Sequence, residues 1–133
     1  MNKVTHFELP TNDKAKSKAF YSNVFDWQIA DIPVQMNGGT GSYTTAMTVA
    51  TDPTTMMPTE LGAINGAIRE RKGEITAPVI TITVDSIDEY FKKVTDAGGK
   101  VVEGKQTIEH VGHYAYVADP DGNVIGLWEN IVR

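Results

Sequence analysis

Apolar and polar positions change along the chain from the two-residue period of a strand to the 3.6-residue period of a helix. Residues 4–9 predict a strand, and residues 14–25 predict an amphipathic helix. Asn12 or Asp13 is suited to begin this helix, because either side chain accepts a hydrogen bond from a free helical N–H. Asp26 is suited to the left-handed position that ends it, since Asp tolerates that conformation better than a branched residue does.

The apolar positions of this first helix lie near the 3.6-residue period, and we expect them to pack on the core while the lysines take the solvent side. The apolar positions are Ala15, Ala19, Phe20, Val24 and Phe25, and the lysines are Lys14, Lys16 and Lys18. Three strands are predicted to follow, at 27–34, 43–49 and 61–71, with a glycine-rich hairpin loop at 36–42 and an irregular loop at 51–60.

The second half of the chain repeats this order. Strands are predicted at 79–84, 100–103, 112–118 and 123–131, and a helix at 87–97 that Asp85 or Ser86 begins and Gly98-Gly99 ends. Shifting the first half by 73 positions places His6 on Val79 and Tyr21 on Val94, with strands and helix ends in register. The pattern therefore predicts an α+β fold with an internal duplication, β-α-β-β-β twice.

The repeat also predicts which side chains share a sheet face, because side chains alternate along a strand. The predicted helix-facing set, Phe7, Leu9, Ile80, Ile82 and Val84, is apolar, and the opposite set, His6, Glu8, Val79, Thr81 and Thr83, is more polar. We expect the polar faces to line a concave cleft. The alternative is two half-exposed strands whose polar faces meet water.

Length and composition narrow the function further. The chain has 133 residues, 41% of them hydrophobic, which favours one globular domain of two repeated modules, 1–72 and 76–133. Its formal net charge of −5 argues against nucleic-acid and anionic-membrane partners. Cysteine is absent, which excludes disulfides, thiolate metal sites and a cysteine nucleophile. We expect a cytoplasmic protein, because no signal-peptide or membrane-spanning run is present.

Two groups of residues resemble a known superfamily. The first is His6, Asp13, Phe20-Tyr21 and Val24-Phe25-Asp26-Trp27, and the second is the closing run 116–129, Tyr-Val-Ala-Asp-Pro-Asp-Gly-Asn-Val-Ile-Gly-Leu-Trp-Glu. Both resemble the vicinal oxygen chelate proteins, which include glyoxalases, bleomycin-resistance proteins and extradiol dioxygenases, and the chain is most similar to their short, single-domain, glyoxalase-related type. The resemblance implies two βαβββ modules whose curved sheets form a cleft, commonly completed in a homodimer.

The resemblance also implies four inward positions that hold a divalent metal in the enzymes of the family. Here these positions carry His6, a residue within 61–71 such as Asn65, then Val79, and finally Gly126, where a metal-dependent relative would carry Glu. Valine and glycine side chains supply no ligand atom, so only His6 is retained as a strong ligand. We therefore expect no metal and no other cofactor in the cleft.

Six residues are the candidates for contact with a ligand: His6, Glu8, Thr81, Tyr114, Tyr116 and Trp128. His6 and Glu8 are also the best candidates for acid–base catalysis, although a lone strand histidine is more often a hydrogen-bonded, partly buried side chain. The two tyrosines would form aromatic walls or be ordinary core residues. Trp128 would stack on an aromatic ligand in a void beside Gly126, or pack in the core.

Two functions of different classes fit these observations. The first is a small-molecule-binding protein of the antibiotic-sequestering or sensor type, with a largely metal-free cleft and an unidentified ligand. The alternative is a metal-dependent lyase, isomerase or dioxygenase of the glyoxalase type with an atypical ligand set. The metal content of the purified protein distinguishes the two, because only the alternative requires a bound metal ion.

Overall fold

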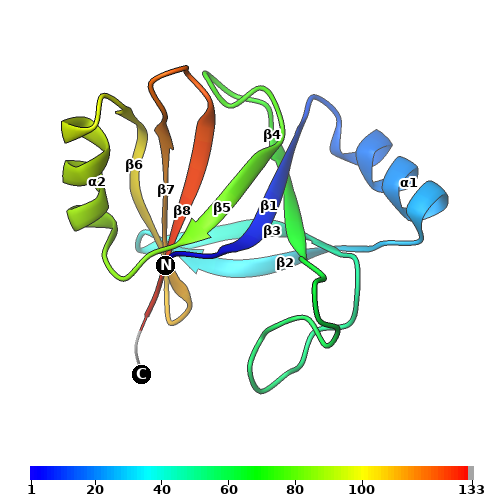
Figure 1. Ribbon diagram of the computed structural model, residues 1–133. Helices are drawn as coiled ribbons and strands as arrows, with labels where there is room; N and C mark the ends of the chain where they lie inside the picture. The colour runs from blue at the N-terminus through cyan, green and yellow to red at the C-terminus, as the bar shows by residue number, and fades with distance from the viewer. Residues whose placement is uncertain (132–133) are drawn as a thin grey trace. The chain divides into compact units, whose positions relative to one another are not determined.

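A computed structural model describes residues 1–131, and its helices and strands follow the order βαβββ twice (Figure 1). The first module comprises β1 (Val4–Thr11), α1 (Lys14–Phe25), β2 (Gln28–Met36), β3 (Gly39–Met47) and β4 (Gly66–Glu70). The second comprises β5 (Val79–Thr83), α2 (Ile87–Asp96), β6 (Lys100–Ile108), β7 (Gly112–Ala118) and β8 (Val124–Asn130). The predicted α+β fold of two βαβββ modules is confirmed.

Some predicted boundaries were wrong. The strand expected at 100–103 continues to Ile108, because a register irregularity between Glu103 and Gln106 lets β6 stay paired with β7. The strand expected at 61–71 begins only at Gly66. The glycine-rich hairpin loop is shorter than expected, since β3 begins at Gly39.

Within residues 1–131, neither helix is long and apolar enough to cross a bilayer.

The chain forms two compact units, which we call the α1 unit and the α2 unit after the helix that each contains. The α1 unit holds residues 6–33 and 42–78, and the α2 unit holds 1–5, 34–41 and the chain from Val79 onward. The ends of β1, β2 and β3 thus belong to the α2 unit.

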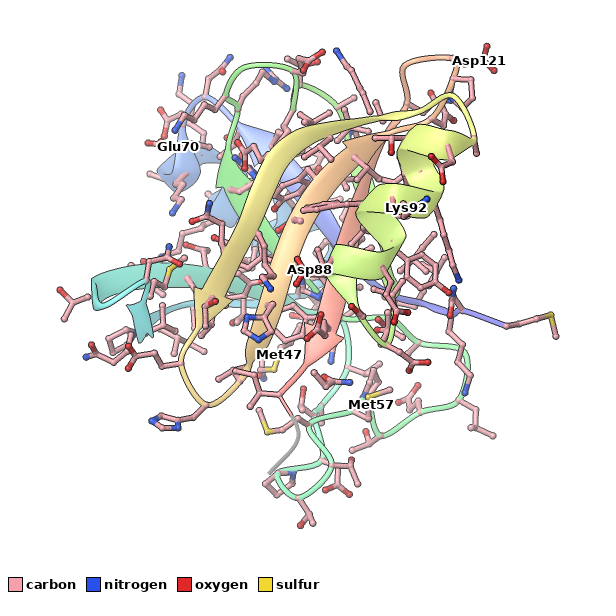
Figure 2. The ribbon with its side chains drawn as sticks, turned by 90° about the vertical axis from the view of Figure 1, so that its left-hand side faces the viewer. Met47, Met57, Glu70, Asp88, Lys92 and Asp121 are labelled. Atoms are coloured by element: carbon pink, nitrogen blue, oxygen red, sulfur yellow. The ribbon has the colours of Figure 1, made fainter. Side chains whose placement is uncertain are left out.

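The α2 unit is a sheet covered by its helix, as the repeat predicted. β5 runs parallel to β8, which pairs antiparallel with β7, and β7 pairs antiparallel with β6. A buried cluster of Val84, Ile87, Ala115, Val117 and Leu127 lies between α2 and the sheet. The polar side of α2 faces away from this cluster (Figure 2), and its Asp88 forms a 3.0 Å ion pair with Lys105 of β6.

Both ends of α2 are capped as its sequence predicts. Ser86 accepts a hydrogen bond from the Glu89 N–H, and Gly98, at φ 93°, takes the left-handed position after the helix. Glu129 adds a second cap from β8, because its Oε1 accepts the Ile87 N–H at 2.7 Å. These contacts fix where β8 lies against the start of α2.

In the α1 unit, β4 lies between two partners. β1 runs parallel to β4, with Phe7 opposite Gly66, and β3 runs antiparallel to it, with Ala46 opposite the same glycine. A side chain on Gly66 would lie 2.4 Å from the Phe7 carbonyl oxygen and 2.6 Å from its ring. The ring of Phe7 therefore packs directly on the backbone of β4, with Trp27 5.6 Å away.

The ends of α1 are as predicted, but its orientation is the reverse of the prediction. Asp13 caps the first turn and Asp26 ends the helix at φ 63°. The residues expected in the core are nevertheless exposed, Phe20 by 52%, Val24 by 56% and Phe25 by 55%, and Ala15 and Ala19 are also exposed. The expectation that these apolar residues pack on the sheet was wrong.

A polar network beneath α1 explains the reversal. Lys18 Nζ lies 3.1 Å from Asp31 Oδ2, and the buried Thr44 hydroxyl donates to Asp31 Oδ1 at 2.6 Å. These two hydrogen bonds, with Thr44 first, lower the pKa of Asp31 and keep its carboxylate ionised. The hydroxyls of Thr11 and Ser17 are 2.6 Å apart in the same layer. The sheet-facing side of α1 is thus held by hydrogen bonds and an ion pair.

Candidate functional site

His6 lies on the face of its sheet opposite α1 and is paired with a tyrosine. The neighbouring Phe7 marks the α1 side by its contact with Trp27, so alternation places His6 on the other side. The Tyr43 hydroxyl lies 2.9 Å from His6 Nε2, and the two rings stack with centroids 6.4 Å apart. His6 and Tyr43 therefore form a hydrogen-bonded aromatic pair within the α1 unit.

Burial determines the charge of this pair. Removal of the imidazole from water lowers the pKa of His6 from 6.5 to about 4, so the ring is neutral at pH 7. A neutral imidazole has one donor and one acceptor nitrogen. The pair is consequently uncharged, and its second imidazole nitrogen, Nδ1, has no hydrogen-bond partner within the described residues.

Glu8 also lies on this face, and only 7% of its surface is exposed. Its partner in the parallel ladder is Ala67 of β4. Two opposing effects act on His6, because a nearby carboxylate would favour the charged ring and burial opposes it. Burial prevails in the structure, and the neighbour bonded to the ring is Tyr43.

Asn65, the amide that the sequence offered as a ligand, is already fully engaged. Its Oδ1 accepts hydrogen bonds from the backbone N–H groups of Thr48 and Val49 and from the Thr48 hydroxyl, at 2.8–3.1 Å. Its Nδ2 donates to the Val49 carbonyl and the Thr51 hydroxyl. Asn65 therefore anchors the start of the long segment between β3 and β4, which carries Met57 (Figure 2).

The last two of the four family positions lie in the α2 unit. Val79 is 1% exposed, which makes it part of the apolar interior. Gly126 lies directly opposite Thr81 of β5 and Tyr116 of β7. A side chain on Gly126 would begin 2.6 Å from the Thr81 hydroxyl oxygen. Thr81 therefore occupies the space where a metal-dependent relative would carry its glutamate, and the void expected beside Gly126 does not exist.

Four of the six candidate residues share the α2-unit face opposite α2. In adjacent rows of the ladder, Thr81 and Tyr116 flank Gly126, while Tyr114 and Thr83 flank Trp128. The two tyrosine rings pack edge to face at 6.1 Å. The Thr83 hydroxyl is 2.6 Å from that of Thr5. This face combines aromatic rings with hydroxyl groups and carries no charged side chain in these two rows of β5, β8 and β7.

Trp128 does not point toward Gly126. Its indole covers Gly112, where an added side chain would lie 2.3 Å from the six-membered ring, and its Nε1 donates to Asn130 Oδ1 at 2.7 Å. The indole is thus directed toward the start of β7, where Gly112 lies opposite Asn130, four residues along β8 from the position beside Gly126 that the sequence analysis assigned to a stacked ligand.

The residues at the family's metal positions do not fit a metal ion. The imidazole of His6 is neutral and already hydrogen-bonded to a phenol, and the amide of Asn65 is held by five hydrogen bonds. Val79 is a buried apolar residue, and Gly126 is covered by a threonine. Divalent cations in such sites need three or more His or carboxylate ligands. Within residues 1–131 no group of three or more His, Asp or Glu side chains is placed to hold a metal ion.

Tyr43 is the functional candidate that the sequence analysis missed. The alternation along β3 would have put it on the face opposite Thr44, but only the order β1–β4–β3 shows that this face is also that of His6. Strand order is a tertiary feature that one sequence does not specify. The sequence did contain one indication that such a partner exists, which is His6 itself, since a partly buried imidazole needs a hydrogen-bond partner.

Two βαβββ modules in tandem, each with a polar sheet face opposite its helix, define a protein of the vicinal oxygen chelate fold. The chain belongs to the Glyoxalase/Bleomycin resistance protein/Dioxygenase superfamily, which matches residues 3–127.

Its curated relatives are longer proteins. The chain is 31% identical over 124 residues to "Putative glyoxylase CFP32" of Mycobacterium tuberculosis, an alignment that covers 92% of this chain and 43% of the relative. It is 28% identical over 126 residues to "Anthracycline biosynthesis protein DnrV" of Streptomyces peucetius, covering 92% and 45%. The chain thus spans less than half the length of both relatives.

Solved structures share the fold at low identity. A methylmalonyl-CoA epimerase of Streptomyces coelicolor in complex with 2-nitronate-propionyl-CoA aligns over 99% of both chains, with a TM-score of 0.64 and 10% identity. A glyoxalase/bleomycin resistance protein/dioxygenase superfamily member from Vibrio splendidus aligns over 98% of this chain and 100% of its own, with a TM-score of 0.55 and 12% identity. At these identities the likeness concerns the fold.

Proposed function

We propose that this protein binds a planar, hydroxylated aromatic molecule without a metal ion. The observation that carries the proposal is the uncharged His6–Tyr43 pair, which stands where the family's first metal ligand would be and offers hydrogen bonds in place of charge. A binder of this kind holds a ligand by apolar contact and orients it with a few polar groups.

The α2 unit supports the same ligand chemistry. Its polar face carries the partly buried Tyr114 beside the buried Tyr116, and this aromatic surface with phenol groups suits contact with an aromatic ring and hydrogen bonding to phenol or quinone oxygens. The name of the relative DnrV refers to anthracycline biosynthesis, and anthracyclines are planar, hydroxylated and aromatic. An anthracycline is therefore the first ligand to test.

Daunorubicin, a fluorescent anthracycline, is expected to raise the melting temperature of the protein. Ligand at one hundred times its Kd stabilises the folded state by about 2.7 kcal/mol, provided that it binds the folded state alone. A thermal unfolding series at increasing daunorubicin, with a fluorescence titration for the Kd, measures the effect. An unchanged melting temperature and an unchanged fluorescence would contradict the proposal.

The same titration on two matched variants tests the His6–Tyr43 pair. Tyr43→Phe removes the phenol and should weaken binding roughly tenfold, which corresponds to one hydrogen bond of about 1.4 kcal/mol. Tyr90→Phe makes the same chemical change on α2, where the hydroxyl accepts from the exposed Asn2, and should leave the Kd unchanged. If the two variants changed the Kd for daunorubicin equally, His6 and Tyr43 would not be part of the binding site.

Metal content separates this function from a metal-dependent lyase, isomerase or dioxygenase. Protein purified without chelator is expected to hold substoichiometric zinc, nickel, iron and manganese by elemental analysis. Dialysis against EDTA should leave both the melting temperature and daunorubicin binding unchanged, because no donor set within residues 1–131 requires an ion. A stoichiometric metal that His6→Ala abolishes would establish the alternative.

A further inference from the structure

The dipeptide Asn-Gly occurs at two places in the chain, Asn37-Gly38 and Asn65-Gly66. In this dipeptide the backbone nitrogen of the glycine can attack the side-chain amide carbon of the asparagine, because glycine has no side chain to obstruct the approach. Asparagine is for this reason a thermolabile residue. The two copies share this chemistry, so a difference in their reactivity comes from the fold.

Asn37 and Gly38 form the two-residue turn between β2 and β3. Their φ angles are 50° and 81°, the two positive values that a type I′ hairpin turn requires. Both residues are exposed, and no atom lies within 4 Å of the position that a Gly38 side chain would take. The Gly38 N–H donates no hydrogen bond within residues 1–131. The attacking nitrogen is therefore open to water, which can remove its proton.

The side-chain amide of Asn37 is held by β6. The Thr107 N–H donates to Asn37 Oδ1 at 2.9 Å, and Asn37 Nδ2 donates to Gln106 Oε1 at 2.7 Å. The first contact favours the reaction, since a backbone N–H stabilises the negative charge that develops on Oδ1 during the attack. Both contacts belong to the junction between the hairpin and β6, where the Asn37 N–H also donates to the Thr107 carbonyl at 3.1 Å.

Asn65-Gly66 is protected from the same attack. Gly66 is buried in β4, where Phe7 lies opposite it on β1 and Ala46 lies opposite it on β3. The five hydrogen bonds of the Asn65 amide have to break before its carbon can turn toward the Gly66 nitrogen. The barrier to the attack is therefore higher at Asn65 than at Asn37.

We propose that Asn37 is a site of spontaneous deamidation in the folded protein and that Asn65 is not. The Gly38 nitrogen bonds to Asn37 Cγ, the bond from Cγ to Nδ2 breaks, and the amide group leaves as ammonia with the proton that Gly38 N–H gives up. Water then opens the succinimide ring at one of its two carbonyls. The products are aspartate, or isoaspartate, in which the main chain passes through the side-chain carbon. Water is the only co-reactant.

The modification weakens the junction between the hairpin and β6. A carboxylate has no N–H group, so position 37 no longer donates to Gln106 Oε1, and two acceptors face each other. Gln106 can turn its amide over only by giving up the contact of its Nε2 with the Gly104 carbonyl oxygen, 3.5 Å away. Isoaspartate in addition lengthens the main chain at a turn whose two residues fit the type I′ geometry.

Peptide mapping by mass spectrometry tests the site. In folded protein kept at pH 8, the peptide that contains Asn37 should gain the mass of an amide-to-acid exchange roughly tenfold faster, or more, than the peptide that contains Asn65. In guanidinium chloride the two rates should become similar, because the same dipeptide then reacts without the fold. Equal rates in the folded protein would show that both sites react only after unfolding and would overturn the proposal, as would an Asn37 peptide that stays unmodified.

Hydrogen exchange tests the effect on the junction. Asn37→Asp supplies the aspartate product, and Asn12→Asp makes the same charge change at an exposed asparagine before α1. The amides of residues 106–108 should exchange several-fold faster in Asn37→Asp than in wild type and should be unchanged in Asn12→Asp. Equal exchange in all three proteins would refute the weakening of the junction. Melting curves verify that both variants fold. Neither test uses daunorubicin, so this proposal and the proposed function fail separately.

Discussion

Replacement of Gly66 by alanine is expected to lower the free energy of unfolding by about 3 kcal/mol, at the upper end of the range for overpacked interiors. The new Cβ would lie 2.4 Å from the Phe7 carbonyl oxygen and 2.6–2.7 Å from two carbons of its ring. A backbone oxygen cannot turn away as a flexible side chain does, so β1 would have to separate from β4. Urea unfolding of the purified variant measures the loss.

Gly104→Ala provides the matched control. Gly104 lies in β6 with no atom within 4 Å of an added Cβ and without a left-handed backbone. The free energy of unfolding should therefore stay within about 0.5 kcal/mol of wild type. If Gly66→Ala were as stable as Gly104→Ala, the close approach of Phe7 to β4 would be wrong. Because Phe7 and His6 are adjacent on β1, Gly66→Ala should also disturb the His6–Tyr43 pair.

The modules were predictable from sequence because local signals and global fold agree in them. The 73-residue repeat aligns strand with strand, and Asp13, Ser86, Asp26 and Gly98 carry cap chemistry that each helix uses as expected. Consistent signals of this kind specify one structure. The family resemblance includes two of these caps, Asp13 and Asp26, and the superfamily match over 3–127 confirms it.

The orientation of α1 was not predicted because apolar periodicity was read without its partner surface. The repeat contained the correction. The sheet-facing residues of α2, Ile87, Tyr90, Phe91 and Val94, correspond to Lys14, Ser17, Lys18 and Tyr21 of α1. What the sequence could not supply is the reason why lysine is tolerated there, since Asp31 and Thr44 come from two other strands.

The candidate site was predictable only in part. Alternation along β1 and the repeat predicted the side of the sheet on which His6 lies. The absence of a metal, expected from the residue types at 79 and 126, stays a prediction. The engagement of Asn65 and the cover of Gly126 by Thr81 depend on contacts between segments that are 14–17 and 45 residues apart, which no local pattern encodes. The same is true of the 37-residue separation between His6 and Tyr43.

Acidification from pH 8 to pH 5 is expected to destabilise the folded protein by about 2 kcal/mol through His6 alone, given a pKa of about 4 in the folded state and 6.5 in the unfolded chain. The sign follows from proton binding. Below pH 6.5 the His6 side chain is protonated in the unfolded chain but stays neutral in the folded protein down to about pH 4. The free energy of unfolding therefore falls as the pH drops. The loss grows to about 3 kcal/mol below pH 4, where the folded ring is protonated as well.

Urea unfolding at pH 8, 6 and 5 on two histidine variants isolates this contribution. His6→Gln keeps a hydrogen-bonding group beside Tyr43 but cannot titrate, so it should lose about 2 kcal/mol less than wild type between pH 8 and pH 5. His110→Gln, on the exposed turn between β6 and β7, still contains His6 and should retain the wild-type dependence. Equal pH dependence in wild type and His6→Gln would mean that the imidazole is not buried in its neutral form. The buried, neutral imidazole on which the binding proposal rests would then be lost, because a solvated His6 with the ordinary pKa of 6.5 would become charged between pH 8 and pH 5.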